Sequence, residues 1–422
     1  MRRFLIFAIL LFLLAGCANI SSLLSTPEPA TLATNTPVTI ITSTPTATPT
    51  ITPGGPRTLR IWVPPQFDPS AETPAGALLQ ERLDEFVARR PGLQIEVRVK
   101  AESGTSGLLN ALTATRSAAP SAMPDLVALS RADMESATTK GLLHPLDGLT
   151  TLPDNPDWYP YARQMAHIQN TTFGLPFAGD ALALVGYRYP LPTVWNELPE
   201  ETLFIFSAAD PHALFTLSLY LSAGGTLQDS QGLLAIDEAI LAKALSLYVP
   251  DAENQFISPQ VITYENNEQS WNAFREQRGN LVVTWISRFL QEQTLPLALA
   301  PLPGIETDQY SLATGWSWAL AGSNPENQPL AVELAEFLSD SQFLAEWTQA
   351  AGYLPTRPTA LSSWADAQIQ LILIQTAESA ILIPGEDLLV TVGPLFAEAT
   401  LSVINGEQLP AEAAQFVVEQ LK

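Results

Sequence analysis

Two short stretches, Leu59-Arg60-Ile61-Trp62-Val63 and Ile95-Glu96-Val97-Arg98-Val99, decide the fold class of this chain. In each stretch aliphatic residues alternate with other side chains, which is the two-residue period of a β-strand. Between them lies a helical pattern that ends at Pro91-Gly92 and has apolar residues at Leu79, Leu83, Phe86 and Val87. Two strands joined by a helix form a βαβ unit, and such units build parallel sheets. The sequence therefore predicts an α/β fold.

The alternation of strands and helices continues along the chain. It indicates a helix over 108–119, a strand over 125–129 and a helix over 134–140, and it halts near Leu149. The pattern resumes near Leu182, with strands expected over 182–187, 281–285 and 297–300. Further helices are expected over 211–223, 271–276, 329–338 and 342–350, and after the capping residue Asp237. The interruption between the two halves indicates two lobes.

The composition fits two or three globular domains. The chain has 422 residues, 46% of them hydrophobic and 15% charged, with one cysteine. These values exclude disordered, collagen-like and disulfide-rich chains. The formal net charge is -23 at pH 7, and a surface of this sign repels nucleic acid phosphates and anionic lipid headgroups. Nucleic acid is therefore excluded as a main partner.

The first residues have the pattern of an export signal. Arg2 and Arg3 precede an apolar run over 4–14, which is too short to span a bilayer core about 30 Å thick as a helix. It ends in Leu14-Ala15-Gly16-Cys17, which resembles the lipobox of bacterial lipoproteins, in which the cysteine is acylated and becomes the mature N-terminus. The resemblance implies a signal peptide over 1–16 and lipid attachment through Cys17 at the extracytoplasmic face of the cell membrane. Since Cys17 is the one cysteine, the chain forms no disulfide.

A linker follows the expected lipid anchor. Between Thr26 and Pro53 there are eleven threonines, six prolines and a single charged residue, Glu28. Prolines favour extended polyproline II, so a segment of this kind extends up to roughly 90 Å. Threonine-rich stretches of exported proteins are also substrates for O-glycosylation, which the sequence leaves open. We assign residues 17–56 to a lipidated spacer and residues 57–422 to the folded part.

Several fragments of the folded part occur in an order found in one family of proteins. No single fragment is specific, but their order and spacing between residues 58 and 420 resemble the extracellular solute-binding proteins of bacterial ABC importers, the sugar-binding family that includes maltose-binding protein. The fragments are Leu59-Arg60-Ile61-Trp62, Pro91-Gly92-Leu93-Gln94-Ile95-Glu96-Val97, Met123-Pro124-Asp125-Leu126, Gly141-Leu142-Leu143-His144-Pro145-Leu146-Asp147, Gly174-Leu175-Pro176-Phe177, Pro192-Thr193-Val194-Trp195-Asn196-Glu197-Leu198, Gly224-Gly225-Thr226-Leu227, Ala300-Pro301-Leu302-Pro303-Gly304, Ala335-Glu336-Phe337-Leu338 and Gly352-Tyr353-Leu354-Pro355-Thr356-Arg357.

The resemblance implies a periplasmic-binding-protein-like fold with two α/β lobes, three chain crossings and a ligand cleft between the lobes. By position the crossings are expected near residues 181–184, 299–302 and 339–341. The N-terminal lobe is then expected to comprise 57–182 and 300–340, and the C-terminal lobe 183–299 and 341–422. The implied function is capture of a small solute, above all a carbohydrate, by a monomer that needs no cofactor and no metal and delivers its ligand to the transmembrane subunits of an ABC permease.

Sugar sites combine aromatic faces, which pack on the C–H face of a sugar ring, with carboxylates and arginines that bond hydroxyl groups. Trp62 ends the first expected strand, and Ser130 and Arg131 follow the third. Ligands of open α/β sheets bind at such carboxyl ends of strands. Trp62 lies on the strand face opposite the aliphatic residues. Because central strands are covered on both faces, a cleft position and a core position both remain open for it.

The resemblance adds five further candidates. Asp180 occupies the first expected crossing, where the family often has an acidic residue that bonds a sugar hydroxyl; an aspartate that caps a turn is the alternative. Trp285 matches a position that faces ligand in relatives, with core packing as its alternative. Trp316 and Trp318 share one strand face, toward either ligand or core, in a segment that lines the family's cleft. Arg357 is expected to have a specific partner, with a surface ion pair as the default.

Two further segments bear on the ligand. Near Asp210-Pro211-His212 the family can place another polar contact. Where maltose-binding relatives carry an aromatic pair for a long glucan, this sequence reads Val392-Gly393-Pro394-Leu395. The difference argues against a malto-oligosaccharide ligand.

Other classes of function have weaker support in the sequence. There is no phosphate-binding loop, dinucleotide fingerprint or zinc-protease helix, and the three histidines, His144, His167 and His212, lack metal-ligand spacing. Gly315-Trp316-Ser317-Trp318-Ala319 partly matches a nucleophile elbow, but that turn needs small residues beside the serine. We therefore expect no enzyme. The alternatives are a receptor for a polyamine or a peptide, a sensor or adhesin lipoprotein without transport, and a secreted glycoside hydrolase.

Overall fold

The structure is a computed structural model that describes residues 57–187, 190–195, 198, 201–249, 256–292, 294–307, 309–322 and 324–421. Residues 53–422 form one compact unit. The expected signal peptide, the lipidation site Cys17 and the spacer over 17–56 lie outside the described residues.

A nine-stranded sheet forms the centre of this unit. Its strands are β1 (Arg57–Val63), β2 (Leu93–Val99), β3 (Leu126–Ser130), β6 (Gly174–Gly186), β7 (Phe204–Ile205), β8 (Leu281–Trp285), β9 (Ala298–Pro301), β10 (Ser311–Leu320) and β11 (Ala380–Leu382), and β4 (His167–Ile168) and β5 (Thr171–Thr172) form a separate pair. The main path runs β2-β1-β3-β10-β6-β8-β7, with β9 paired to β6 and β11 to β10. β1 pairs in parallel with both β2 and β3, which confirms the predicted parallel unit.

Helices occupy most of the segments between the strands. They are α2 (Pro74–Ala88), α3 (Leu108–Ala118), α4 (Arg131–Thr139), α5 (Pro160–Ala166), α6 (Leu214–Ser222), α7 (Glu238–Leu245), α8 (Asn267–Arg275), α9 (Ile286–Gln291), α10 (Gln328–Leu338), α11 (Ser341–Ala351), α12 (Pro358–Leu361), α13 (Ala367–Ser379), α14 (Glu386–Ile404) and α15 (Pro410–Gln420), with 3₁₀ turns η1 (Pro65–Phe67), η2 (Pro120–Ala122), η3 (Leu152–Asp154), η5 (Ser246–Tyr248) and η6 (Pro259–Thr263). The predicted cap is confirmed, because the Asp237 carboxylate accepts the N–H of Ile240 at 3.0 Å in the first turn of α7.

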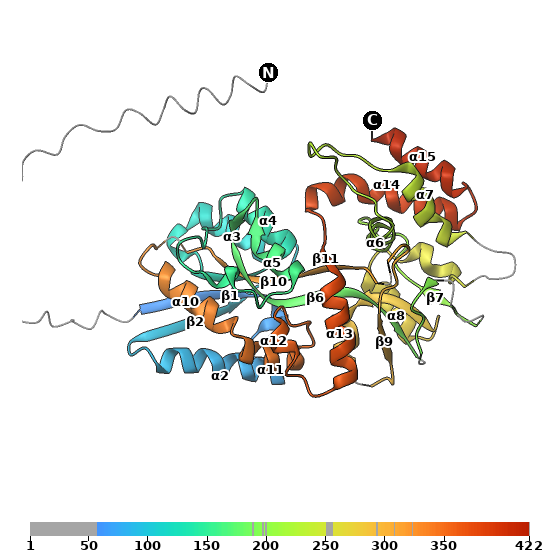
Figure 1. The fold of residues 1–422 in the computed structure, drawn as a ribbon. Helices are drawn as coiled ribbons and strands as arrows, with labels where there is room; N and C mark the ends of the chain where they lie inside the picture. Colours follow the sequence, from blue (N-terminus) through green and yellow to red (C-terminus); the bar gives the residue numbers. More distant parts are fainter. Residues whose placement is uncertain are drawn as a thin grey trace, which may run out of the picture. The chain divides into compact units, whose positions relative to one another are not determined.

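β6 belongs to two parts of the sheet. Its residues 174–181 pair with β10, and its residues 182–186 pair with β8. β10 in turn pairs with β3 through residues 316–320 and with β11 through residues 311–313. Figure 1 shows β6 extending from the region of β1 and β10 toward α8 and β9. These two long strands therefore join the parts of the sheet on which the lobes are built.

The buried apolar side chains form two hydrophobic clusters. The N-lobe cluster includes Ile61 of β1 and Leu83 of α2, and the C-lobe cluster includes Phe204 of β7 and Phe396 of α14. α5 packs on β6, β10 and β11, and its Tyr161 belongs to the C-lobe cluster. A separate core for each lobe accounts for the restart of the strand and helix pattern in the sequence.

The assignment of residues to two lobes stays a proposal. The packing of α11 and of two leucines leads us to propose new positions for the second and third chain crossings. α11 packs on α2, and its Trp347 belongs to the N-lobe cluster. We therefore place the third crossing near residues 354–361 instead of 339–341. Leu302 and Leu312 belong to the C-lobe cluster, so we place the second crossing within β10 instead of near 299–302. We keep the first crossing near 181–184.

The sequence pattern misses the first half of β6. This half contains Gly174, Pro176 and Gly179, residue types that are depleted in strands. The register of β6 with β10 shifts between the pairs Trp316–Ala178 and Ser317–Pro176, which leaves Phe177 as the extra residue of a β-bulge. A bulge tolerates a proline, which has no N–H to donate. Pairing along the buried strand thus overrides the local preference.

One helix of the described part, α14, is long and apolar enough to cross a membrane, judged by length and composition. Half of its most apolar part is buried inside the structure, where α14 packs against α15 and α6. A core helix of a water-soluble protein has the same properties, so α14 alone assigns no membrane span.

Gly179→Ala is expected to lower the free energy of unfolding by about 1–3 kcal/mol, the usual cost of overpacking a buried site. A Cβ at Gly179 would lie 2.0 Å from the hydroxyl oxygen of Tyr161 and 3.0 Å from the carbonyl oxygen of Leu354. Both neighbours are fully buried. Chemical denaturation of the variant and the wild type measures the loss.

Tyr161→Phe provides the matched partner for this test. The Tyr161 hydroxyl is buried and has no hydrogen-bond partner among the described residues. Its removal therefore breaks no hydrogen bond with them. The double variant Gly179→Ala/Tyr161→Phe should recover part of the loss, because the nearest clashing atom is gone. A double variant as unstable as Gly179→Ala alone would contradict the steric explanation.

Candidate functional site

Polar side chains gather where β1, β2 and β3 end. Gln66 lies in η1, just after β1; Glu102 follows β2; and Asp133 lies in the first turn of α4, directly after β3. Gln66 Nε2 donates to Glu102 Oε2 at 3.2 Å. Because the three parallel strands end at one edge of the sheet, these side chains form the N-lobe half of a candidate ligand site.

Asp133 lies near the first turn of α14, which packs in the C-lobe. The pKa of Asp133 is raised from 3.8 to about 6, first by burial and then by the negative charges of Glu102 and Glu386, while Lys140 lowers it. Glu386 is the first residue of α14, and its Oε1 lies 3.7 Å from His212 Nε2. Carboxylates of both lobes therefore act on one another at the beginnings of α4 and α14.

Tyr353 connects these carboxylates with β6 and α9. Burial raises the pKa of the Tyr353 phenol, the negative charges of Asp180 and Glu102 raise it further, and the Arg288 guanidinium lowers it. Asp180 lies on β6 and Arg288 on α9, so charged groups of both lobes act on the same phenol, which also has a hydrogen bond with Gln291. We call the following set the interlobe site: Gln66, Glu102, Asp133, Asp180, Arg288, Tyr353 and Glu386.

The carboxylate of Asp180 binds groups of the protein. Its Oδ1 accepts the N–H of Ala181 at 3.0 Å and the N–H of Ser287 at 3.0 Å, and its Oδ2 accepts the Ser287 hydroxyl. Ser287 lies in the first turn of α9, so Asp180 holds the beginning of that helix against β6. Burial raises the pKa of Asp180 to about 6, although these hydrogen bonds lower it. Asp180 thus positions α9 and its Arg288; a direct bond to ligand stays a prediction.

Arg131 is also engaged within the protein. Its Nε donates to Glu135 Oε1 at 2.7 Å. Its Nη1 donates to three carbonyl oxygens at the end of α5, those of Gln164 at 3.2 Å, Met165 at 2.9 Å and His167 at 2.7 Å. The guanidinium therefore ties α4 to α5, and a further role as ligand contact stays a prediction.

Ser130 and Arg357 have comparable structural contacts. Ser130 caps α4, since its Oγ accepts the N–H of Asp133 at 3.2 Å. Arg357 is 7% exposed; its Nε donates to Asp157 Oδ2 at 3.0 Å and its Nη1 to the carbonyl oxygen of Ser339 at 2.9 Å. Arg357 is thus buried and pairs with a partly buried carboxylate, so this ion pair is not fully at the surface.

Three of the predicted tryptophans lie in the N-lobe cluster. Trp62 and Trp318 are 2% exposed and Trp316 is 8% exposed. Trp316 packs edge-on against Phe67, with ring centroids 5.2 Å apart, and Trp318 stacks on Phe177 at 4.5 Å. All three side chains thus pack in the core cluster, and their assignment to the ligand site stays a prediction.

Trp62 lies near a cation, and Trp285 is less deeply buried than the other three tryptophans. The Trp62 indole Nε1 is buried without a hydrogen-bond partner among the described residues, and Lys100 Nζ lies 5.0 Å from its ring centroid. Trp285 ends β8 and is partly buried against the C-lobe cluster. Their assignment to the ligand site stays a prediction.

The remaining sequence candidates have plain structural roles. The Asp210 carboxylate accepts the N–H groups of His212 at 3.0 Å and of Leu214 at 3.2 Å, and so caps α6. Ser317 lies inside β10 and is 1% exposed, whereas a nucleophile elbow requires a turn from strand to helix. Within the described ranges no group of three or more histidine, cysteine or carboxylate residues could hold a metal ion.

Sequence reasoning missed most of the interlobe site: Gln66, Glu102, Asp133, Arg288, Tyr353 and Glu386. The signal for the first three was present, because each follows the carboxyl end of a predicted strand by a few residues. Tyr353 belongs to the fragment Gly352-Tyr353-Leu354-Pro355-Thr356-Arg357, but nothing in that fragment marks it as a ligand contact. Glu386 begins a helix whose place opposite α4 depends on tertiary packing alone.

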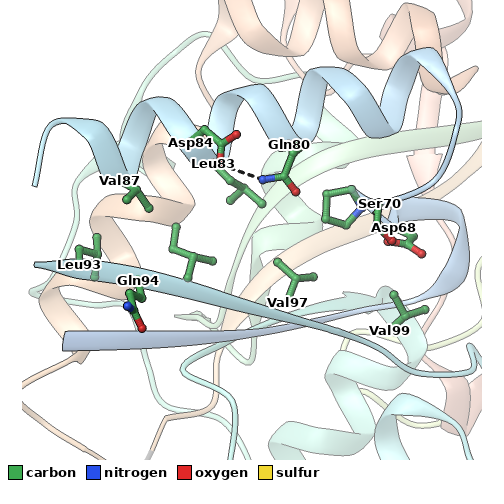
Figure 2. Close-up of a pocket in the computed structure, with 12 residues that line it drawn as sticks. Asp68, Ser70, Gln80, Leu83, Asp84, Val87, Leu93, Gln94, Val97 and Val99 are labelled. Atoms are coloured by element: carbon green, nitrogen blue, oxygen red, sulfur yellow. Dashed lines mark hydrogen bonds between the residues drawn. The ribbon is translucent and has the colours of Figure 1, made fainter. Parts of the chain in front are cut away.

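A groove of about 550 Å³ lies elsewhere, between α2 and β2. Figure 2 shows Leu83 and Val87 of α2 beside Leu93 and Val97 of β2, with Asp68 near one end. β2 is the outermost strand of the main sheet path. The described residues that line this groove include no member of the interlobe site, so we do not assign the ligand to it.

The sequence matches the model of the family "Bacterial extracellular solute-binding protein" over residues 70–342. A search of curated proteins finds no match.

Solved structures of sugar-binding proteins have a similar fold. A cyclo/maltodextrin-binding protein complexed with maltotetraose has a TM-score of 0.70 at 19% identity, over 87% of this chain and 97% of that chain. Maltose-bound MalE3 of T. maritima has a TM-score of 0.66 at 17% identity, over 86% of this chain and 98% of that chain. An ABC transporter solute-binding protein of Thermotoga lettingae bound with α-D-tagatose has a TM-score of 0.63 at 20% identity, over 86% and 98%.

At these identities the likeness shows the fold, and it confirms the expected two-lobed α/β architecture. The family match covers more than half of the sequence and includes strands and helices of both lobes. The chain therefore belongs to the bacterial extracellular solute-binding protein family.

Proposed function

We propose that the chain is a monomeric, lipid-anchored solute-binding protein that captures a small neutral carbohydrate between its lobes and delivers it to an ABC permease. The observation that supports this most is the convergence of groups from both lobes at the interlobe site, with Glu102 and Asp133 from one lobe and Arg288 and Glu386 from the other. A ligand bound there contacts both lobes at once, which stabilises their closed arrangement.

The groups of the interlobe site suit a ligand that is rich in hydroxyl groups. Carboxylates such as Glu102 accept charge-assisted hydrogen bonds from hydroxyls, while Gln66 and Tyr353 both donate and accept. Solved structures of similar fold contain maltotetraose, maltose and α-D-tagatose. The family binds solutes for transport, and we propose binding without catalysis here as well.

A ligand with an ammonium group is the second candidate. The interlobe site contains four carboxylates, those of Glu102, Asp133, Asp180 and Glu386, and one guanidinium, that of Arg288, which also lies 3.8 Å from Glu268 Oε2. Such an excess of negative charge also attracts amines, which pack on aromatic rings as well. The two candidates differ in how their binding responds to salt.

A thermal-shift screen of mono- and disaccharides, polyamines and short peptides is expected to give stabilisation by a sugar. Stabilisation should approach about 2.7 kcal/mol at a hundredfold excess over the dissociation constant. Because a sugar is neutral, its affinity should stay constant between low and high salt, whereas amine affinity should fall steeply. A shrinking radius of gyration in small-angle scattering should accompany binding. Stabilisation by amines or peptides alone would contradict the carbohydrate assignment.

Tyr353→Phe tests whether the hydroxyl group of Tyr353 contributes to ligand affinity. The substitution removes one hydroxyl but keeps the ring that packs on Phe67 at 5.5 Å, so the fold should survive. Loss of one hydrogen bond to ligand should weaken binding about five- to tenfold. Tyr310→Phe, on a partly buried tyrosine against the C-lobe cluster, is the matched control and should leave the affinity unchanged.

Asp180→Asn is expected to flatten the dependence of stability on pH. The folded pKa of about 6 lies above the ordinary 3.8, so the folded chain retains a proton that the unfolded chain has released. Between about pH 4 and pH 6 the stability of the wild type therefore falls as pH rises. Denaturation at a series of pH values should show a smaller fall for Asp180→Asn, and Asp154→Asn, on an exposed aspartate, should match the wild type. Equal slopes for Asp180→Asn and wild type would exclude this role.

Cys17→Ser is expected to release the protein from the membrane. The lipobox resemblance makes Cys17 the acylated residue, and serine has no thiol to receive the lipid. Cell fractionation should move the variant from the membrane pellet to the soluble fraction, while the same substitution should leave ligand-induced stabilisation intact. Retention of the variant in the membrane would disprove the anchor.

A further inference from the structure

A hydrogen bond joins α4 to α14, in addition to the connection that β6 and β10 make between the lobes. Glu135 Oε2, on α4, accepts the backbone N–H of Glu386, the first residue of α14, at 3.2 Å. A Cβ built on Gly385 would lie 3.6 Å from the same oxygen. α4 packs on β3 and β10, and α14 packs on α6, α7 and α15. The bond therefore joins the N-lobe to the C-lobe.

The beginning of α14 has no cap of its own. Its N-cap residue, Gly385, has no side chain, and the first turn supplies no capping hydrogen bond. Several other helices have a local cap: Asp237, Asp340 and Asp366 each accept backbone N–H groups at the beginnings of α7, α11 and α13. The free N–H groups of a helix N-terminus attract an anion. For α14 that anion is Glu135, from the other lobe.

Glu135 is held ready for this contact from its own side. Its Oε1 accepts Arg131 Nε at 2.7 Å, and Arg131 is fixed by the three carbonyl oxygens at the end of α5. The side chains of Glu135 and Arg131 are 19% and 14% exposed. A carboxylate already ordered by its neighbours loses little entropy when it binds the helix end.

We propose that Glu135 is an interlobe latch: it binds the N-terminus of α14 when the lobes approach and releases it when they separate. The latch offsets the repulsion that Asp133 has with Glu102 and with Glu386. It sets how much of the ligand-free protein is closed, and through that population the apparent affinity. The proposal rests on the proposed capture of ligand between the lobes.

Distance measurements on ligand-free protein test the latch. Spin labels are attached to cysteines at Thr139, the last residue of α4, and at Val390, in α14, in the full chain with Cys17→Ser; both positions are exposed and uncharged. Glu135→Ala should shift the distance distribution to longer values. Glu81→Ala, on an exposed glutamate of α2, is the matched control and should leave the distribution unchanged.

A second variant separates a latch from a merely local helix cap. Gly385→Ser gives α14 a cap of its own, and Gly385 has a φ of -57° that serine adopts freely. Hydrogen exchange at the first amides of α14 should become about five- to tenfold faster in Glu135→Ala and should return toward the wild-type rate in Glu135→Ala/Gly385→Ser. The distance distribution should stay long in both variants.

Wild-type distances in Glu135→Ala and in the double variant would overturn the proposal. Recovery of the short distance in the double variant would also overturn it, because it would assign Glu135 to helix capping alone. No ligand enters these measurements, so an error in the carbohydrate assignment leaves their result unaffected.

Discussion

The antiparallel pairing of β6 with β10 is the constraint on which the rest of the structure depends. Each strand has one half in the sheet of each lobe, so the hydrogen bonds between them hold both lobes to a common axis. At the middle of the pair Gly179 faces Gly315, and neither position has room for a side chain, since Tyr161, Leu354 and Ala178 fill the space. Asp180, the next residue, then fixes α9 to the same point. The framework and one side of the interlobe site are therefore set by the same few residues.

The sequence predicted the elements whose local pattern agrees with their final environment. β1, β2 and the helix between them follow from periodicity alone, and the cap at Asp237 follows from its chemistry. The first half of β6 could not be predicted in this way, because Pro176 and Gly179 are unfavourable in an isolated strand and become acceptable only when a bulge and a close neighbour require them. The two lobes followed from the interruption of the pattern after Leu149, whereas the chain crossings and the cleft came from the family resemblance, which depends on the order of many weak fragments.

The sequence could predict where the candidate site lies, but not which groups each of its side chains contacts. Ser130 and Arg131 do lie at the carboxyl end of β3, as the strand pattern implies. What the sequence cannot give is the partner: the Arg131 guanidinium binds the carbonyl oxygens at the end of α5, and Trp316 and Trp318 pack on phenylalanines of the core. Burial and hydrogen-bond partners depend on segments distant in sequence. The residue types that best suit a sugar site, arginine and tryptophan, therefore turn out to bind or pack on other parts of the protein.

The place of β10 between β3 and β6 has a consequence for the time course of folding. β3 ends at Ser130 and β10 begins at Ser311, so the N-lobe sheet has a gap at its centre until the later strand is synthesised. At about 5–20 residues per second this interval lasts on the order of 10–40 s. Pairing over such a sequence separation is intrinsically slow. The first lobe can therefore complete its sheet only after β8 and β9 of the second lobe have been synthesised.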